Sequence, residues 1–143
     1  MWVIFEGLDK SGKTTLEYEF LKATNYKHIV IDRGPVGYMT FDDLFCRHEF
    51  GSNLHFVMQA TEIMEDSDDF MVVYCVVDEE TANARLKAHN ETCPYNYAKA
   101  QKLYDDNIRM FYKPEKTLRL DTSNKTIDEC VKLIVEKLEE VRR

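Results

Sequence analysis

The stretch Gly7-Leu8-Asp9-Lys10-Ser11-Gly12-Lys13-Thr14 satisfies the pattern G-x-x-x-x-G-K-[ST] at every fixed position. The apolar run Trp2 to Phe5 precedes it, and helix-forming residues resume at Lys13. Strand, glycine-bearing loop and helix in this order are typical of a P-loop. Glycine lets the backbone turn its N–H groups inward, and the following helix presents its positive end to an anion. The stretch therefore predicts a phosphate-binding loop; the alternative is a glycine turn that binds nothing.

We expect this loop to hold ATP together with Mg²⁺. Lys13 can reach the outer phosphates of a nucleotide, and Thr14 can ligate Mg²⁺ through its hydroxyl. The loop residues that we predict to bind the nucleotide are Gly7, Lys10, Ser11, Gly12, Lys13, Thr14 and Thr15.

A second candidate site follows the expected strand His28 to Ile31, which ends in Asp32-Arg33. Carboxyl ends of neighbouring parallel strands gather around one crevice, so a strand beside the first would bring both residues to the phosphates. Asp32 could then hold a Mg²⁺-bound water or accept the proton of the acceptor hydroxyl, and Arg33 could neutralise a phosphate. The alternative is a surface ion pair, or a turn in which Asp32 bonds only to backbone.

The rest of the chain alternates apolar strands with amphipathic helices. We expect two helices between Tyr38 and Asp66 with a break at Gly51-Ser52, a buried strand over Met71–Val77, a helix from Asp78 to about His89, a helix over Tyr95–Tyr112, a strand over Thr117–Leu120 and a last helix opened by Thr126 and Glu129. This order indicates an α/β fold of the P-loop NTPase type, with three layers and a small, mostly parallel sheet of about four strands flanked by helices. We expect one domain over residues 1–143.

The stretch from Phe5 to Thr15 resembles the phosphate loop of thymidylate kinases, and Asp32-Arg33 resembles the Asp-Arg pair that follows a later strand in that family. Val76 to Leu86 is similar to the penultimate strand of that family and the helix leading into its lid. The resemblance implies that Asp9 contacts the acceptor nucleotide and that Arg85 lies near the ATP phosphates, with a short lid near residues 85–98. It implies an ATP- and Mg²⁺-dependent kinase that transfers the γ-phosphoryl group to a deoxynucleoside monophosphate such as dTMP.

The chain departs from thymidylate kinases where the acceptor would bind. About 17 residues separate Thr14 from Asp32, so the strand with the family's Arg-Glu-Pro motif is missing. Gly37 replaces a frequent serine, and Lys10 stands where arginine is common, which keeps the charge without the planar fork. Compact phage kinases of this type act on nucleotides or on DNA hydroxyls. Three alternatives therefore stay open: phosphoryl transfer to a DNA hydroxyl, phosphoryl transfer to a nucleoside, or nucleotide binding without catalysis.

Composition restricts the partners of the chain. A net charge of −7 and a pI near 5.1 repel polyanions, so a nucleic-acid coat role is excluded and a DNA acceptor is not favoured. No apolar run approaches a membrane span, and four cysteines without a C-x-x-C pair favour reduced, buried thiols. We expect a cytoplasmic protein, in the host cytoplasm if viral, with a small nucleotide substrate and with a homodimer left open.

Aromatic residues near the expected lid have two interpretations: stacking on a base, or half-buried packing with a hydrated hydroxyl. We favour packing for the tyrosines, which are Tyr95, Tyr97, Tyr104 and Tyr112. We expect core positions for two of the three phenylalanines Phe41, Phe45 and Phe56.

Overall fold

A computed structural model describes residues 1–46 and 53–143 of the chain. Its elements are β1 (Trp2–Glu6), α1 (Lys13–Ala23), β2 (Ile29–Asp32), α2 (Pro35–Leu44), α3 (Asn53–Asp66), β3 (Phe70–Val76), α4 (Glu79–Ala88), α5 (Tyr97–Phe111), the 3₁₀ helix η1 (Pro114–Lys116), β4 (Thr117–Asp121) and α6 (Ile127–Arg142). The predicted alternation of strands and helices is confirmed.

The four strands form one parallel sheet in the order β2-β1-β3-β4. β3 is buried at all seven positions because it lies between β1 and β4 and has helices on both faces. This burial accounts for its uninterrupted apolar sequence. β2 pairs with β1 as expected, with Phe5 opposite Asp32. The last residue of β2 is therefore brought to the loop that follows β1.

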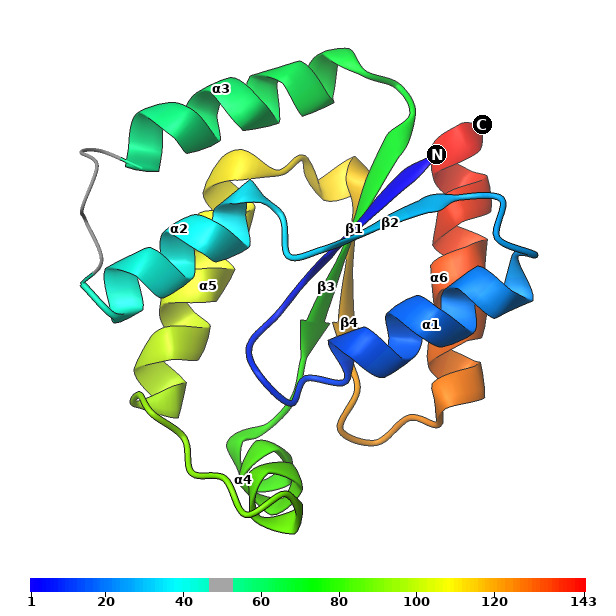
Figure 1. The fold of residues 1–143 in the computed structure, drawn as a ribbon. Coiled ribbons are helices and arrows are strands. Elements are labelled where there is room, and N and C mark those ends of the chain that lie inside the picture. The colour runs from blue at the N-terminus through cyan, green and yellow to red at the C-terminus, as the bar shows by residue number, and fades with distance from the viewer. Residues whose placement is uncertain (47–52) are drawn as a thin grey trace.

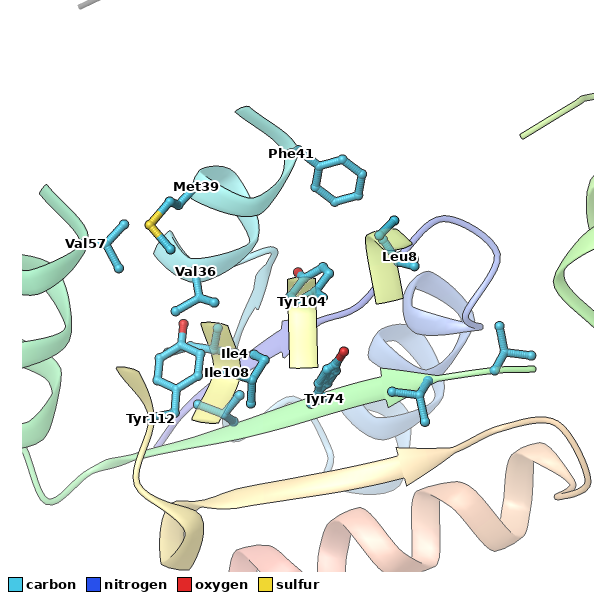
Figure 2. Close-up of a cluster of buried hydrophobic side chains, with 14 of the residues drawn as sticks. Ile4, Leu8, Val36, Met39, Phe41, Val57, Tyr74, Tyr104, Ile108 and Tyr112 are labelled. Carbon is cyan, nitrogen blue, oxygen red and sulfur yellow. The ribbon is translucent and has the colours of Figure 1, made fainter. Parts of the chain in front are cut away.

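Helices cover the sheet on both faces and complete three layers (Figure 1). α1 and α6 lie on one face, where Leu16, Phe20 and Ile134 pack against Phe5 and Val73. α2 and α5 lie on the other face, with α3 beside α2 and α4 near the carboxyl ends of the strands. Figure 2 shows this second core, in which tyrosines of β3 and α5 lie among aliphatic side chains.

Several predicted boundaries were wrong by one to three residues. β2 covers Ile29–Asp32 instead of 28–31, β3 covers Phe70–Val76 instead of 71–77, and α5 covers Tyr97–Phe111 instead of 95–112. α2 begins at Pro35, three residues before Tyr38, where the segment expected to hold two helices starts. Proline fits the first turn of a helix because its missing N–H would have no partner there. The expected break at Gly51-Ser52 lies outside the described residues.

Two helix starts agree with the capping signals in the sequence. Asp78 accepts a hydrogen bond from the Thr81 N–H at 2.7 Å, and Thr126 accepts one from the Glu129 N–H at 3.1 Å. The cysteine prediction was partly wrong, because Cys75 and Cys130 are buried but Cys46 is exposed. In the part of the chain that the structure describes, every helix is too short or too polar to cross a membrane.

Candidate functional site

The loop between β1 and α1 owes its shape to its two glycines. Gly7 has φ of +150°, and a Cβ atom there would lie 2.5 Å from the carbonyl oxygen of Cys75, so a side chain is excluded. Gly12 has φ of +89° and is the N-cap of α1. The first hydrogen bond of α1 runs from the Leu16 N–H to the Gly12 carbonyl at 3.1 Å. The N–H groups of residues 13–15 therefore have no intrahelical acceptor and can bind an anion.

A cleft of about 910 Å³ opens beside this loop. The loop and the first turn of α1 form its floor, and its walls include Arg85, His89, Lys125 and Ile127. Thr14 and Thr15 are exposed at its base. The cleft therefore lies where the free N–H groups of α1 point, as a nucleotide site requires.

Lys13 and Asp32 form an ion pair across the carboxyl ends of β1 and β2. Partial burial acts to raise the pKa of Asp32, but the hydrogen bond and the charge of Lys13 outweigh burial and hold this pKa below its ordinary value. Asp32 is therefore an ionised carboxylate beside the phosphate loop, where the sequence predicted it.

Glu17 is a site residue that sequence reasoning missed. It lies one helical turn after Lys13 on α1 and is buried. Burial, and then the negative charge of Asp32, raise the pKa of Glu17 to about 7. Its i,i+4 spacing from Lys13 was the available signal, because residues four apart share one face of a helix.

Asp9 and Arg33 meet on the other side of the loop. The Arg33 guanidinium lies 4.0 Å from Asp9 Oδ1, and its central carbon lies 4.0 Å from the centroid of the Phe41 ring. The Tyr95 hydroxyl donates to Asp9 Oδ2 at 3.3 Å, and the Tyr95 ring lies 5.9 Å from the ring of Phe45. Carboxylate, guanidinium and three aromatic rings thus form a group on the side of the loop facing α2.

Arg85 lies in the wall of the cleft and fastens two loops together. Its guanidinium donates to the Lys10 carbonyl at 2.8 Å and to the Thr122 carbonyl at 3.2 Å. Lys10 extends toward the segment after α4, where Glu91 lies 3.5 Å from its Nζ atom. Both residues border the cleft, and a direct role for either at the phosphates stays a prediction.

The expected hydration of the tyrosine hydroxyls was wrong for three residues, one of which is Tyr112, whose hydroxyl is buried. Tyr97 donates to the Val77 carbonyl at 2.7 Å, and Tyr104 accepts from the Gly7 N–H at 3.0 Å, with both side chains buried. Packing of Phe41 and Phe45 against the core is confirmed, whereas Phe56 is 57% exposed.

Glu6, the last residue of β1, is the second site residue that the sequence reasoning missed. It is fully buried, and burial raises its pKa to about 8 despite the opposing effects of backbone hydrogen bonds, Lys13 and Arg33. A charged residue at the end of an apolar strand was the available signal, since such residues are rarely buried without a specific partner.

The donor groups of the site fit a nucleotide and Mg²⁺. The Ser11 Oγ atom is buried and has no hydrogen-bond partner in the described structure, which leaves it free for a phosphate oxygen. The Thr14 hydroxyl and the Asp32 carboxylate are oxygen ligands of the kind that Mg²⁺ prefers. Oxygen ligands and unpaired N–H groups therefore lie at the same end of the sheet.

The parallel sheet, the loop after β1 and the helix N-terminus behind that loop define an α/β fold of the P-loop type.

No protein-family model matches the chain, and no curated protein matches it. Among solved structures, it is similar to the YorR protein of Bacillus subtilis, crystallised in complex with phosphorylated GDP, with a TM-score of 0.77 and 17% identity over 97% of this chain and 96% of that chain. Thymidylate kinase from Candida albicans is similar with a TM-score of 0.59 and 13% identity, over 99% of this chain and 92% of that chain. At these identities the likeness is one of fold.

Proposed function

We propose that the chain is an ATP- and Mg²⁺-dependent kinase that transfers the γ-phosphoryl group to a nucleotide, with a deoxynucleoside monophosphate such as dTMP as its acceptor. The observation that carries this proposal is the meeting of Asp9, Lys13, Asp32 and Arg33 around one phosphate loop. A loop that only bound a nucleotide would need no second cation and carboxylate on its far side.

The donor side is supported by the cleft and by the free N–H groups of residues 13–15. Lys13 is only 11% exposed and already bonds to one carboxylate, so its ammonium is held at the loop and can turn to an outer phosphate. The buried Ser11 hydroxyl adds a further donor. These groups suit a polyphosphate better than a single phosphate.

The acceptor side is supported by Asp9, Arg33 and the aromatic rings beside them. The guanidinium of Arg33 offers a planar fork for a phosphate, and Asp9 offers an acceptor for a sugar hydroxyl. Phe41, Phe45 and Tyr95 lie within ring-contact distance of one another, which suits a planar base. The fold that the chain shares with thymidylate kinase is consistent with an acceptor of this class.

In this proposal catalysis consists of positioning and charge stabilisation. Lys13 and the loop N–H groups hold the donor phosphates, Arg33 neutralises charge between donor and acceptor, and Asp9 orients the acceptor. Thr14 and, through water, Asp32 would hold Mg²⁺, which when bound neutralises charge on the donor phosphates. Asp32, which Lys13 keeps ionised, can also orient the attacking hydroxyl and accept its proton as the phosphoryl group is transferred.

The test is a transfer assay with radiolabelled ATP over all deoxynucleoside monophosphates, a nucleoside and a short oligonucleotide. Lys13→Ala should lower transfer by about 10²–10³-fold or more, as the loss of a preorganised charge does elsewhere. Lys22→Ala is the matched control, because Lys22 lies on the same helix and contacts Glu19 and Tyr18 at the surface. Wild-type turnover in a folded Lys13→Ala protein would refute the proposal.

Two outcomes of the same screen would select an alternative. Tight ATP binding in a calorimeter without transfer to any acceptor would indicate a nucleotide-binding protein without catalysis. Transfer only to the oligonucleotide or only to the nucleoside would keep the kinase and replace the acceptor.

A further inference from the structure

Glu6 caps helix α2 from another part of the chain. Its buried carboxyl accepts a hydrogen bond from the N–H of Gly34, the N-cap residue of α2, and its Oε1 atom lies close to the backbone of Gly37. Gly34 itself supplies no side-chain cap. A carboxyl oxygen at a helix N-terminus satisfies an N–H group that has no intrahelical partner. The strand that leads into the phosphate loop therefore also holds the start of α2.

Tyr104 extends this contact to the phosphate loop. Its hydroxyl is fully buried and accepts from the N–H of Gly7, the first glycine of the loop. A Cβ atom added to Gly37 would lie 2.5 Å from this hydroxyl and 2.9 Å from Glu6 Oε1. The two oxygens thus flank the backbone of Gly37, and Tyr104 touches both the loop and the first turn of α2.

Arg33 lies between the groups that this network holds. Its φ of +64° is in the left-handed region, which non-glycine residues rarely adopt. The Arg33 N–H donates to the Phe5 carbonyl at 2.8 Å, and the next N–H in the chain donates to Glu6. The backbone on both sides of this strained residue is therefore fixed to the end of β1, which sets the direction of the guanidinium toward Asp9 and Phe41.

We propose that Glu6 and Tyr104 are positioning residues that keep Arg33 in register with the phosphate loop. Neither residue contacts the donor or the acceptor nucleotide. Together they fix the distance between Arg33, the cation on the acceptor side, and the phosphate loop, which holds the donor. The catalytic part of this inference rests on the proposed kinase function, whereas the structural part does not.

The first experiment is a double-mutant cycle on the full chain. Tyr104→Phe and Glu6→Leu each change little volume and remove a buried hydrogen-bond acceptor, and each should lower kcat/KM for the acceptor about tenfold, with a smaller change in the Kd for ATP. In an Arg33→Ala background the same two changes should cost less than twofold, because the group that they position is gone. Equal losses in both backgrounds would overturn the proposal.

The matched control is Tyr74→Phe. Tyr74 is equally buried and its ring lies 5.2 Å from the Tyr104 ring, but its hydroxyl bonds to Asp105 at 2.8 Å, away from the loop. We expect kcat/KM within twofold of wild type for this variant. A tenfold loss here would point to general core packing and would also overturn the proposal.

A second measurement does not need turnover. Amide hydrogen exchange by NMR should be at least tenfold faster at Arg33 and Gly34 in Glu6→Leu and Tyr104→Phe, with the β3 amides unchanged. If the wild-type protein transfers phosphate to no acceptor, the proposed function fails, and exchange alone then decides the structural inference. Unchanged exchange at Arg33 and Gly34 would overturn it.

Discussion

Gly37 lies against three side chains that leave no room for a Cβ atom. Besides the Tyr104 hydroxyl and Glu6, the Cγ atom of Arg33 lies 2.6 Å from where that atom would be. Gly37→Ala should therefore lower the free energy of unfolding by about 1–3 kcal/mol, the usual cost of overpacking. The measurement is thermal unfolding, with an expected fall in Tm of about 3–10 °C.

Tyr104→Phe supplies the control for this prediction. It removes the oxygen 2.5 Å from the added carbon, so Gly37→Ala should cost less in a Tyr104→Phe protein than in wild type. An equal fall in Tm in both proteins would show that the hydroxyl does not create the conflict.

Glu6 should make stability depend on pH in a defined direction. Its pKa is about 8 in the folded chain against 4.5 for the unfolded residue, so between these values the folded state keeps a proton that the unfolded state releases. Below pH 4.5 the carboxyl is neutral in both states and its burial carries no charge penalty. The stability that Glu6 contributes is therefore full at low pH and is lost as the pH rises toward 8, by about 1.4 kcal/mol per unit at most.

Urea unfolding of wild type and Glu6→Gln at pH 5, 6.5 and 8 measures this effect. Glutamine does not titrate, so the variant should gain stability relative to wild type by a few kcal/mol across this range. Glu17, whose pKa is raised to about 7, is present in both proteins and cancels in the difference. A difference that stays constant with pH would contradict the assignment.

At the scale of elements, the start of α6 offers a separate test. Thr126 caps this helix, and the turn that it fixes carries Lys125 and Ile127 into the wall of the cleft. Thr126→Ala should lower the free energy of unfolding by about 1 kcal/mol, whereas Thr126→Ser, which keeps the hydroxyl, should lower it by much less. Equal urea midpoints for both variants would contradict a capping role.

Elements were predictable where their signals are local. The apolar run of β3, the caps Asp78 and Thr126 and the order strand, glycine-bearing loop and helix depend on neighbouring residues, and these predictions are confirmed. The start of α2 was not predictable in this way. Its N-terminal N–H groups are capped by Glu6, 28 residues earlier in the chain, so no local capping residue is present to read.

The candidate site was predictable to a similar extent. Asp32 was expected beside the phosphate loop because parallel strands end at one edge of a sheet, and it lies there, paired with Lys13. Tyr104 and Arg85 reach the loop over 97 and 75 residues. Contacts of this kind depend on how α5 and α4 pack on the folded sheet. Hydrophobic periodicity predicts that a helix forms, but it does not predict which distant residues the helix will contact.

At the scale of the whole molecule, the charge of −7 makes a prediction about nucleic acid. A labelled 20-nucleotide single strand should show no saturable binding below about 100 μM in 50 mM salt, because non-specific affinity depends on counterion release by basic surfaces. Fluorescence anisotropy measures this. Tight binding that weakens steeply with salt would contradict the prediction and would favour a kinase acting on DNA hydroxyls.

The fit of Gly7 against Cys75 and its hydrogen bond to Tyr104 have a consequence for biosynthesis. The phosphate loop is translated before the residues that shape it, since Tyr104 follows Gly7 by 97 residues. A nascent chain that ends before Tyr104 has the glycine-lysine sequence without the surface that shapes it. The loop is thus early in translation and late in folding, and a ligand bound at the loop would stabilise only chains in which β3 and α5 have packed against it.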